Sequence, residues 1–243
     1  MAASTAVSSA LPRRERARAA TISEIKRTAL DLMRAEATTD VRFSDIARVM
    51  GMTPPALYRY FADRDELLTA LITDAYDDLG AAIAEARDAV PDDDIGGRWL
   101  AGAQAYRGWA NREPQQFALI LGLPVPGYVA PDEGPTTEAA RRALSQLSVL
   151  VIDAMRAGQL GTPLVREVDP VLEVCVVGKN EELPVAIPPE NYQAMLLAWS
   201  LLHGFTSLEA YGHLGWMPPE ARDALFLAQV RLAATTVGLP APT

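Results

Sequence analysis

Cysteine and histidine are scarce in this sequence. Its 243 residues include one cysteine, Cys175, and two histidines, His203 and His213. A single cysteine excludes an intramolecular disulfide framework and a cysteine-rich zinc site. Two histidines leave little material for a multi-histidine metal centre. We therefore expect neither a bound metal nor a cofactor.

The sequence motifs of common enzymes are also missing. There is no Gly-x-Ser-x-Gly string, and neither histidine lies in a known catalytic string, so a nucleophile triad is unsupported. There is no Gly-x-Gly-x-x-Gly string and no P-loop for nucleotide chemistry. The acidic run Asp92-Asp93-Asp94 follows Pro91, which is typical of a solvated linker rather than of an acid/base pair. The sequence therefore predicts no catalytic residues, and we expect that the protein is not an enzyme.

Segments that could cross or enter a membrane are lacking as well. The uncharged stretch from Asn191 to Leu208 contains Asn, Gln, Ser, His and Thr, so it predicts a buried helix. Residues 1–11 are small and polar and precede the first arginines, whereas a secretory signal has the opposite order. We expect a cytoplasmic protein without membrane contact.

What the chain does have is apolar material and an uneven charge. Hydrophobic residues make up 49% of the sequence, which is enough for a real core, and the net charge is −9. The first 70 residues carry 11 basic and 9 acidic residues, whereas the remainder carries 11 and 22. A basic run at Arg13, Arg14, Arg16 and Arg18 predicts a flexible arm over residues 1–20. Taken alone, such a run is typical of a solvated tail.

Helix signals follow one another closely after this arm. Thr21 and Glu24 form a capping-box pattern that predicts a first helix ending around Ala37. Three further starts are predicted, by Ser44 as a second cap, by Thr53 with Pro54 at the first helical position, and by Asp63 with Glu66 as another capping box. The tight turn at residues 51–53 joins the second and third helices, and this arrangement describes a helix-turn-helix. An ordinary helical hairpin in a bundle has the same spacing, so spacing alone favours DNA binding only modestly.

A longer string gives a sharper indication. Residues 43–67 strongly resemble the TetR/AcrR family of bacterial transcriptional regulators, whose signature includes Leu-Tyr-x-[His/Tyr]-Phe followed by Lys-x-x-Leu. Here these elements are the runs 57–61 and 64–67, with Arg64 in place of the usual lysine, which keeps the charge and changes its geometry. The resemblance covers roughly the first third of the chain. It implies a DNA-binding domain over residues 21–67, with the helix-turn-helix at about 44–63.

The resemblance also implies roles for individual residues. Phosphate contacts are expected from Ser44, Thr53, Tyr58 and Arg64, with Arg42 as a further backbone contact. Pro54, Ala56, Arg59 and Tyr60 are expected to face the major groove, and the basic arm to reach an adjacent minor groove. Leu57 and Phe61 are expected in the core.

Residues 68–243 are predicted to form a larger helical domain, which makes the fold all-α with about nine helices in total. Residues 171–177 have strand propensity, but their helical surroundings favour a helix. Aromatic and apolar residues suggest two interpretations, plain core packing or the wall of a ligand pocket. In TetR-like proteins this domain encloses an effector cavity, and the candidate ligand residues are Trp99, Tyr106, Trp109, Phe117, Met155 and Trp199.

The string 199–209 resembles the Trp-x3-His-Gly motif of one TetR-like C-terminal class. In that family the last two long helices form a dimer interface, and the candidates here are Leu201, Gly204, Phe205 and Leu208. His203 is expected to be a buried, hydrogen-bonded core histidine.

These features predict a homodimeric transcriptional regulator, a repressor that a small apolar ligand releases from a palindromic double-stranded DNA operator. Two alternatives stay open. One is a DNA-binding regulator without an effector, in which the aromatic residues are core. The other is a helical dimerisation module that does not contact DNA.

Overall fold

The chain folds entirely into helices and loops. The computed structural model describes residues 12–131, 133–180, 183 and 185–242, and these contain no strand. The ten helices within this part of the chain are α1 (Arg13–Glu36), α2 (Phe43–Val49), α3 (Pro54–Leu57), α4 (Arg64–Asp88), α5 (Ile95–Arg112), α6 (Pro114–Leu121), α7 (Pro135–Arg156), α8 (Pro170–Asn180), α9 (Pro189–Ala210) and α10 (Pro219–Val237). The predicted all-α class is confirmed, with one helix more than the nine expected.

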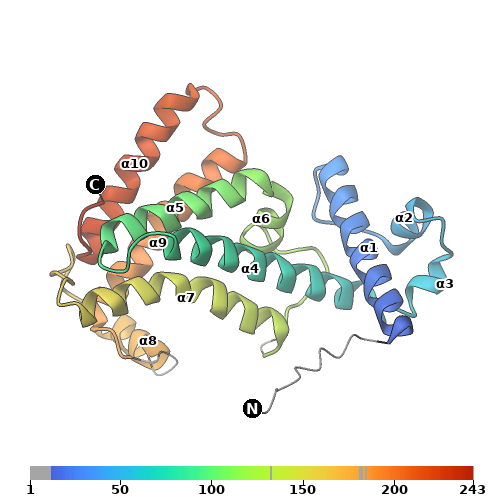
Figure 1. The fold of residues 1–243 in the computed structure, drawn as a ribbon, viewed down its shortest axis with the longest axis horizontal. Coiled ribbons are helices and arrows are strands. Elements are labelled where there is room, and N and C mark those ends of the chain that lie inside the picture. The colour runs from blue at the N-terminus through green and yellow to red at the C-terminus, as the bar shows by residue number, and fades with distance from the viewer. Residues whose placement is uncertain (1–11, 132, 181–182, 184, 243) are drawn as a thin grey trace, which may run out of the picture.

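Helices α1–α3 gather at one end of the molecule, and α4 runs from them through its centre (Figure 1). Ile25, Met33, Ile46 and Leu57 are almost fully buried and bring α1, α2 and α3 around one core. This core also contains Val125 from the loop after α6, so the helix-turn-helix end and the larger domain share apolar contacts.

The first helix begins eight residues earlier than predicted. It starts at Arg13 after the N-cap Pro12, so the predicted start at Thr21 is wrong, and the basic run 13–18 is helical. Thr21 lies within the helix, where its hydroxyl donates to the carbonyl of Ala17 at 3.0 Å. The alanine- and arginine-rich run before Thr21 has high helix propensity, which extends the helix towards the N-terminus. The remainder of the predicted arm, residues 1–11, lies outside the described residues.

The helix-turn-helix differs from its predicted capping in detail. Helix α2 starts at Phe43 without a side-chain cap, so Ser44 is not its N-cap. Thr53 is the N-cap of α3 by position, but its side chain makes no capping hydrogen bond. Helix α3 has four residues, because the backbone tightens after it and the amides of Tyr60 and Phe61 both bond to the carbonyl of Leu57. Gly51 has φ +64°, the left-handed conformation that the turn between α2 and α3 requires.

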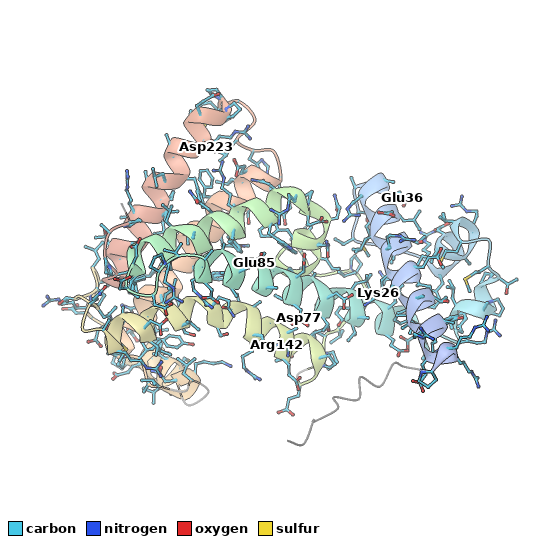
Figure 2. All side chains as sticks on the ribbon, viewed as in Figure 1. Lys26, Glu36, Asp77, Glu85, Arg142 and Asp223 are labelled. Atoms are coloured by element: carbon cyan, nitrogen blue, oxygen red, sulfur yellow. The ribbon has the colours of Figure 1, made fainter. Side chains whose placement is uncertain are left out.

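The capping prediction for the fourth helix is confirmed. Asp63 is the N-cap of α4, and its carboxylate accepts the amide hydrogen bond of Glu66 at 2.8 Å. From there α4 packs against both α5 and α7. Arg142 of α7 and Asp77 of α4 point towards each other and form an ion pair at 2.7 Å (Figure 2).

The remaining helices complete the larger domain. Residues 171–177 lie in α8, as expected from their helical surroundings. The uncharged stretch 191–208 lies in α9, which packs against α10 and buries Ala198, Leu202 and Phe205. None of the described helices combines the length and the apolar character that a membrane span needs.

Candidate nucleic-acid interface and internal cavity

Except for Arg64, the residues that the sequence assigns to DNA contact lie on one small part of the helix-turn-helix. They come from the start of α2, from α3 and from the turn that follows it. Six of them are exposed, namely Arg42, Ser44, Thr53, Pro54, Tyr58 and Arg59, while Ala56 and Tyr60 are partly buried. Exposed hydroxyl and guanidinium groups at this place can donate to phosphates and to base edges.

The basic start of α1 is held against this surface. Arg18 donates from Nη1 to the carbonyl of Arg59 at 2.9 Å, and its guanidinium lies 5.3 Å from the centre of the Tyr60 ring. Tyr58 packs on Phe43 with a ring separation of 5.1 Å, which fixes the base of its side chain while the residue stays 56% exposed. Arg18 therefore adds a positive charge beside the turn that follows α3.

Arg64 stands apart from the other DNA-contact candidates. Its guanidinium donates from Nε to the carbonyl of Val41, from Nη2 to Asp40 and from Nη1 to the carbonyl of Pro126, at 3.2, 2.7 and 3.4 Å. All three nitrogens therefore bond within the chain. Arg64 connects the loop between α1 and α2 with the loop between α6 and α7.

Further contacts join the helix-turn-helix end to the larger domain. The Tyr128 hydroxyl lies 3.0 Å from that of Thr69, and Tyr76 donates to the carbonyl of Ile120 at 2.8 Å. Arg34 of α1 pairs with Glu113 at 2.5 Å. Burial opposes the charge on Glu113, but the hydrogen bonds from Arg34 and Gln116 outweigh it and lower the pKa of this carboxyl group. Helix α6 and its flanking residues thus contact both α1 and α4.

The larger domain contains an internal cavity between α4, α5, α7 and α9. Its volume is about 40 Å³, and its lining is mainly apolar. Three of the predicted ligand residues, Trp99, Tyr106 and Trp199, line it. The other three lie elsewhere: Trp109 and Phe117 are fully buried in a separate core cluster, and Met155 packs against the main core.

Two polar side chains also line the cavity, and sequence reasoning missed both. Arg87 of α4 donates to the side-chain oxygen of Gln146 of α7 at 2.6 Å and forms two further bonds to Asp88. Leu79, Ile83 and Arg87 follow one another at four-residue spacing on one face of α4. An arginine in an apolar stripe is a signal that could have pointed to this site.

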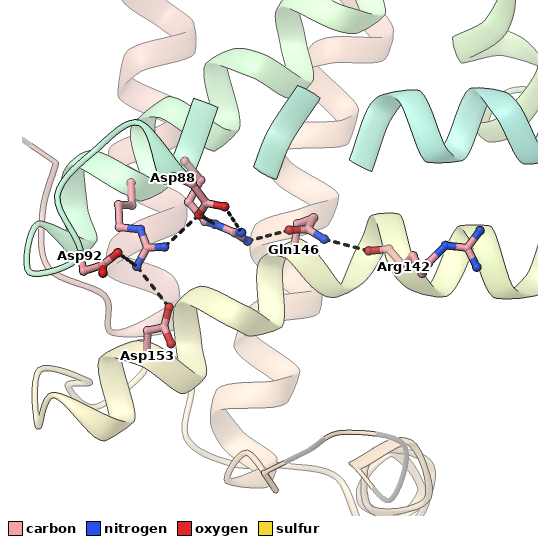
Figure 3. A network of polar contacts seen from close by, with 7 residues as sticks. Asp88, Asp92, Arg142, Gln146 and Asp153 are labelled. Atoms are coloured by element: carbon pink, nitrogen blue, oxygen red, sulfur yellow. Dashed lines mark hydrogen bonds and ion pairs between the residues drawn. The ribbon is translucent and has the colours of Figure 1, made fainter. Parts of the chain in front are cut away.

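Arg87 belongs to a larger polar network (Figure 3). Arg98 of α5 is buried and pairs with Asp88, Asp92 and Asp153 at 3.1–3.4 Å. The hydrogen bond from Arg87 is the largest of the interactions that lower the pKa of Asp88. The network joins the end of α4 to α5 and α7 at the end of the cavity remote from the helix-turn-helix.

A second series of polar contacts connects the cavity wall with α9. The Tyr106 hydroxyl lies 2.8 Å from Nδ1 of His203, and Nε2 of His203 lies 3.3 Å from the Ser207 hydroxyl. The Trp199 ring stacks on the His203 ring with centres 5.2 Å apart. Burial lowers the pKa of His203 and raises the pKa of Tyr106. His203 is thus hydrogen-bonded and partly buried between the cavity and the outer side of α9.

The four candidate dimer residues do not share one face of α9. Gly204 and Leu208 are exposed and Leu201 is partly exposed, at a spacing that puts them on one helical stripe with the exposed Leu197. Phe205 points the other way. It is 4% exposed and packs on Phe226 of α10 with ring centres 5.2 Å apart.

A helix-turn-helix with an exposed polar surface, joined through α4 to a helical domain that encloses a cavity, defines a DNA-binding regulator. Family comparisons agree. Residues 25–71 match the model described as bacterial regulatory proteins, tetR family, and residues 99–233 match the model described as a tetracyclin repressor-like C-terminal domain.

Individual proteins show the same relation. The chain is 36% identical over 191 residues to the HTH-type transcriptional regulators Rv1816 of Mycobacterium tuberculosis and Mb1846 of Mycobacterium bovis, covering 77% of this chain and 79% of each relative. The crystal structure of the regulatory protein SCO4313 superposes with a TM-score of 0.70 at 32% identity, covering 92% of this chain and 98% of that one. The TetR family regulator PfmR of Thermus thermophilus shares the fold, with a TM-score of 0.54 at 17% identity, over 89% of this chain and 98% of its own.

The chain belongs to the tetR family of bacterial regulatory proteins. It is a transcriptional regulator with a DNA-binding N-terminal domain, and because this family acts without catalysis, the expectation that it is not an enzyme is confirmed.

Proposed function

We propose that the protein is a homodimeric repressor whose affinity for a palindromic operator falls when a small, mainly apolar ligand enters the internal cavity. The observation that carries this proposal is the course of α4. Its first residue, Arg64, bonds to the helix-turn-helix, and its residues Leu79, Ile83 and Arg87 line the cavity. A ligand that moves α4 therefore acts on the DNA-binding end through a continuous helix.

The exposed residues of the helix-turn-helix supply the DNA contacts in this proposal. Arg42, Ser44, Thr53 and Tyr58 bind phosphates, while Pro54, Ala56, Arg59 and Tyr60 face the major groove. Arg64 is left out of the contact set because its three nitrogens bond within the chain. Two copies related by a two-fold axis would read half-sites roughly 34–36 Å apart or a multiple of that distance.

The outer stripe of α9 supports the dimer. Leu197, Leu201, Gly204 and Leu208 are apolar or small, and α10 adds the exposed Leu225 and Leu232. Two-fold packing of α9 and α10 on their copies would bury these side chains in a four-helix arrangement.

A selection from random duplex DNA tests the proposal directly. The purified protein should enrich a two-fold symmetric site whose binding weakens as salt rises. The enriched duplex then serves as the probe in a screen for apolar compounds that raise the melting temperature and release the DNA. Enrichment of an asymmetric site would contradict the symmetric dimer. Stable operator binding that no cavity-binding compound changes would favour the effector-independent regulator.

A further inference from the structure

Two of the residues assigned to base reading lie outside a regular helix. Helix α3 ends at Leu57, and Arg59 and Tyr60 belong to the turn that follows it. The amide of Tyr60 bonds to the carbonyl of Leu57 at 2.8 Å, which holds one side of this turn. Carbonyl groups at and beyond a helix end have no partner within the helix, so their orientation depends on other groups.

A side chain from another helix holds the carbonyl side of the turn. Arg18 of α1 donates from Nη1 to the carbonyl of Arg59 at 2.9 Å, although the two residues are 41 positions apart. The same guanidinium lies over the ring of Tyr60, 5.3 Å from its centre. An ionised donor stabilises a carbonyl near a helix end, and a guanidinium over an aromatic face adds cation–π attraction. One side chain therefore contacts both residues of the turn.

Helix α1 provides a fixed support for this contact. Arg18, Ile22, Ile25 and Ala29 follow one another at the three- and four-residue spacing of one helical face. Ile22 is partly buried, and Ile25 and Ala29 are almost fully buried in the core that α1 shares with α2 and α3. Arg18 therefore extends the packed face of α1 towards the N-terminus, where it meets the turn after α3.

The conformation of this turn decides where its side chains point. Direct readout needs hydrogen bonds of about 2.7–3.2 Å between a side chain and a base edge. If the turn shifts, Arg59 keeps its charge but loses this geometry. The attraction between charges and phosphates tolerates such a shift, so sequence preference falls more than general affinity does.

We propose that Arg18 is a positioning residue for sequence recognition. Its guanidinium holds the turn after α3 so that Arg59 and Tyr60 meet the base edges. It acts through these two residues and not by contacting a phosphate. The inference rests on the proposed function, which assigns Arg59 and Tyr60 to the major groove.

Arg18→Met tests this role, because methionine is a good helix former without a charge or a strong donor. The measured quantity is the specificity ratio, the dissociation constant for a scrambled duplex divided by that for the operator enriched from random DNA. This ratio should fall about tenfold, the effect of losing roughly one base contact. A phosphate contact would instead leave the ratio unchanged and reduce the slope of log K against log salt by about 1, and this result would overturn the inference.

Arg14→Met is the matched control. Arg14 lies one helical turn before Arg18 on the same face of α1, so both substitutions remove one positive charge from the same side. The hydrogen bond to Arg59 and the contact with the Tyr60 ring are made by Arg18, and Arg14 has no corresponding interaction among the described residues. The control should therefore keep the full specificity ratio. An equal fall in both variants would overturn the specific role of Arg18.

A double substitution separates positioning from stability. If Arg18 acts through Arg59, adding Arg18→Met to Arg59→Ala should lower the ratio by only about threefold or less, because the two losses overlap. Losses that multiply in full would overturn the route through Arg59. Unfolding in urea shows whether each variant is folded, and a lower free energy of unfolding with an unchanged ratio would leave Arg18 with a role in stability alone and overturn the inference.

The single variant Arg59→Ala separates this inference from the proposed function. If Arg59→Ala relaxes the preference at one base position and Arg18→Met leaves the ratio unchanged, the assignment of Arg59 holds and the positioning role fails. If Arg59→Ala weakens binding to all duplexes alike, the assignment of Arg59 to the major groove fails, and the positioning role fails with it.

Discussion

Three arginines of the helix-turn-helix have different surroundings, and these differences predict different roles. Arg42 and Arg59 are exposed, and in the described part of the chain their guanidinium groups have no ion-pair partner. Arg64 instead makes three hydrogen bonds within the chain. A guanidinium that is exposed beside a helix start can exchange its hydration for a phosphate or a base edge, whereas Arg64 would first have to give up existing bonds.

Arg42→Ala and Arg59→Ala should therefore weaken DNA binding in different ways. Loss of the phosphate contact of Arg42 should weaken binding to all duplexes alike and reduce the slope of log K against log salt by about 1. Loss of Arg59 should cost about 1–3 kcal/mol and relax the preference at one base position. Titrations of operator and scrambled duplex at several salt concentrations measure both effects. Arg156→Ala, at the exposed end of α7, is the control, and a uniform loss in Arg59→Ala would place that residue on the DNA backbone.

His203 gives the fold a dependence on pH. Burial lowers its pKa from the ordinary value of 6.5, so the folded protein favours the neutral ring. Below about pH 6.5 the unfolded chain binds more protons than the folded one, and the stabilisation that is complete above this pH is lost as the pH falls towards the folded pKa. The free energy of unfolding in urea should drop less between about pH 7.5 and 5.5 in His203→Gln than in the unaltered protein.

The second histidine provides the control for this measurement. His213 is exposed in the turn between α9 and α10, so His213→Gln should keep the full drop between the two pH values. Carboxylates contribute equally in both variants and cancel in the comparison. An identical pH dependence in the two variants would contradict the assignment to His203.

At the scale of elements, the periodic signals of the sequence predicted the helices well and their ends less well. Asp63 and Glu66 fixed the start of α4 through a local hydrogen bond, and residues 191–208 formed a helix as their pattern indicated. The start of α1 was missed because a run of good helix formers continues a helix past a weaker local cap.

The polar residues of the cavity lining could not be predicted from local sequence patterns, for a different reason. Arg87 and Gln146 are 59 positions apart and meet only because α4 packs against α7. Likewise the sequence predicts Phe205 in the dimer interface, but within one copy its ring is buried against Phe226 of α10. Hydrophobic periodicity in the sequence identifies the apolar faces of a helix. Which of these faces is buried depends on how the helix packs against its neighbours.

Arg64 at the start of α4 bonds both to the loop before α2 and to the loop after α6. We expect Arg64→Ala to reduce the effect of ligand on operator affinity, because the bonds to Asp40, Val41 and Pro126 hold both the helix-turn-helix and the loop after α6 to the start of α4. The ratio of operator dissociation constants with and without ligand measures this coupling. Arg48→Ala is the control, because the ion pair of Arg48 with Asp45 lies within α2. A lower salt slope with an unchanged ratio would instead show that Arg64 contacts a phosphate.

In the proposed function, the whole molecule combines two tasks that need two copies of the chain. One copy carries a helix-turn-helix whose α3 has four residues, so the surface that one copy offers to DNA is small. Two linked copies would bind two half-sites with a raised effective concentration, so affinity would depend on the strength of the link. Ligand control has the same requirement, because a change in the spacing of the two α3 helices matters only when they are joined.

Leu208→Glu tests the link between copies. Leu208 is 47% exposed on the outer stripe of α9, so a carboxylate there should leave the monomer folded, but in a dimer it would place two charges in an apolar contact. Sedimentation should show a monomer, and affinity for the complete operator should fall to that for a half-site. Val174→Glu on the exposed side of α8 is the control and should remain dimeric. Phe205→Ala should act on the fold instead, lowering the free energy of unfolding by about 3–5 kcal/mol, because this ring is buried against Phe226 within one copy. A Leu208→Glu protein that stays dimeric would move the interface away from this stripe.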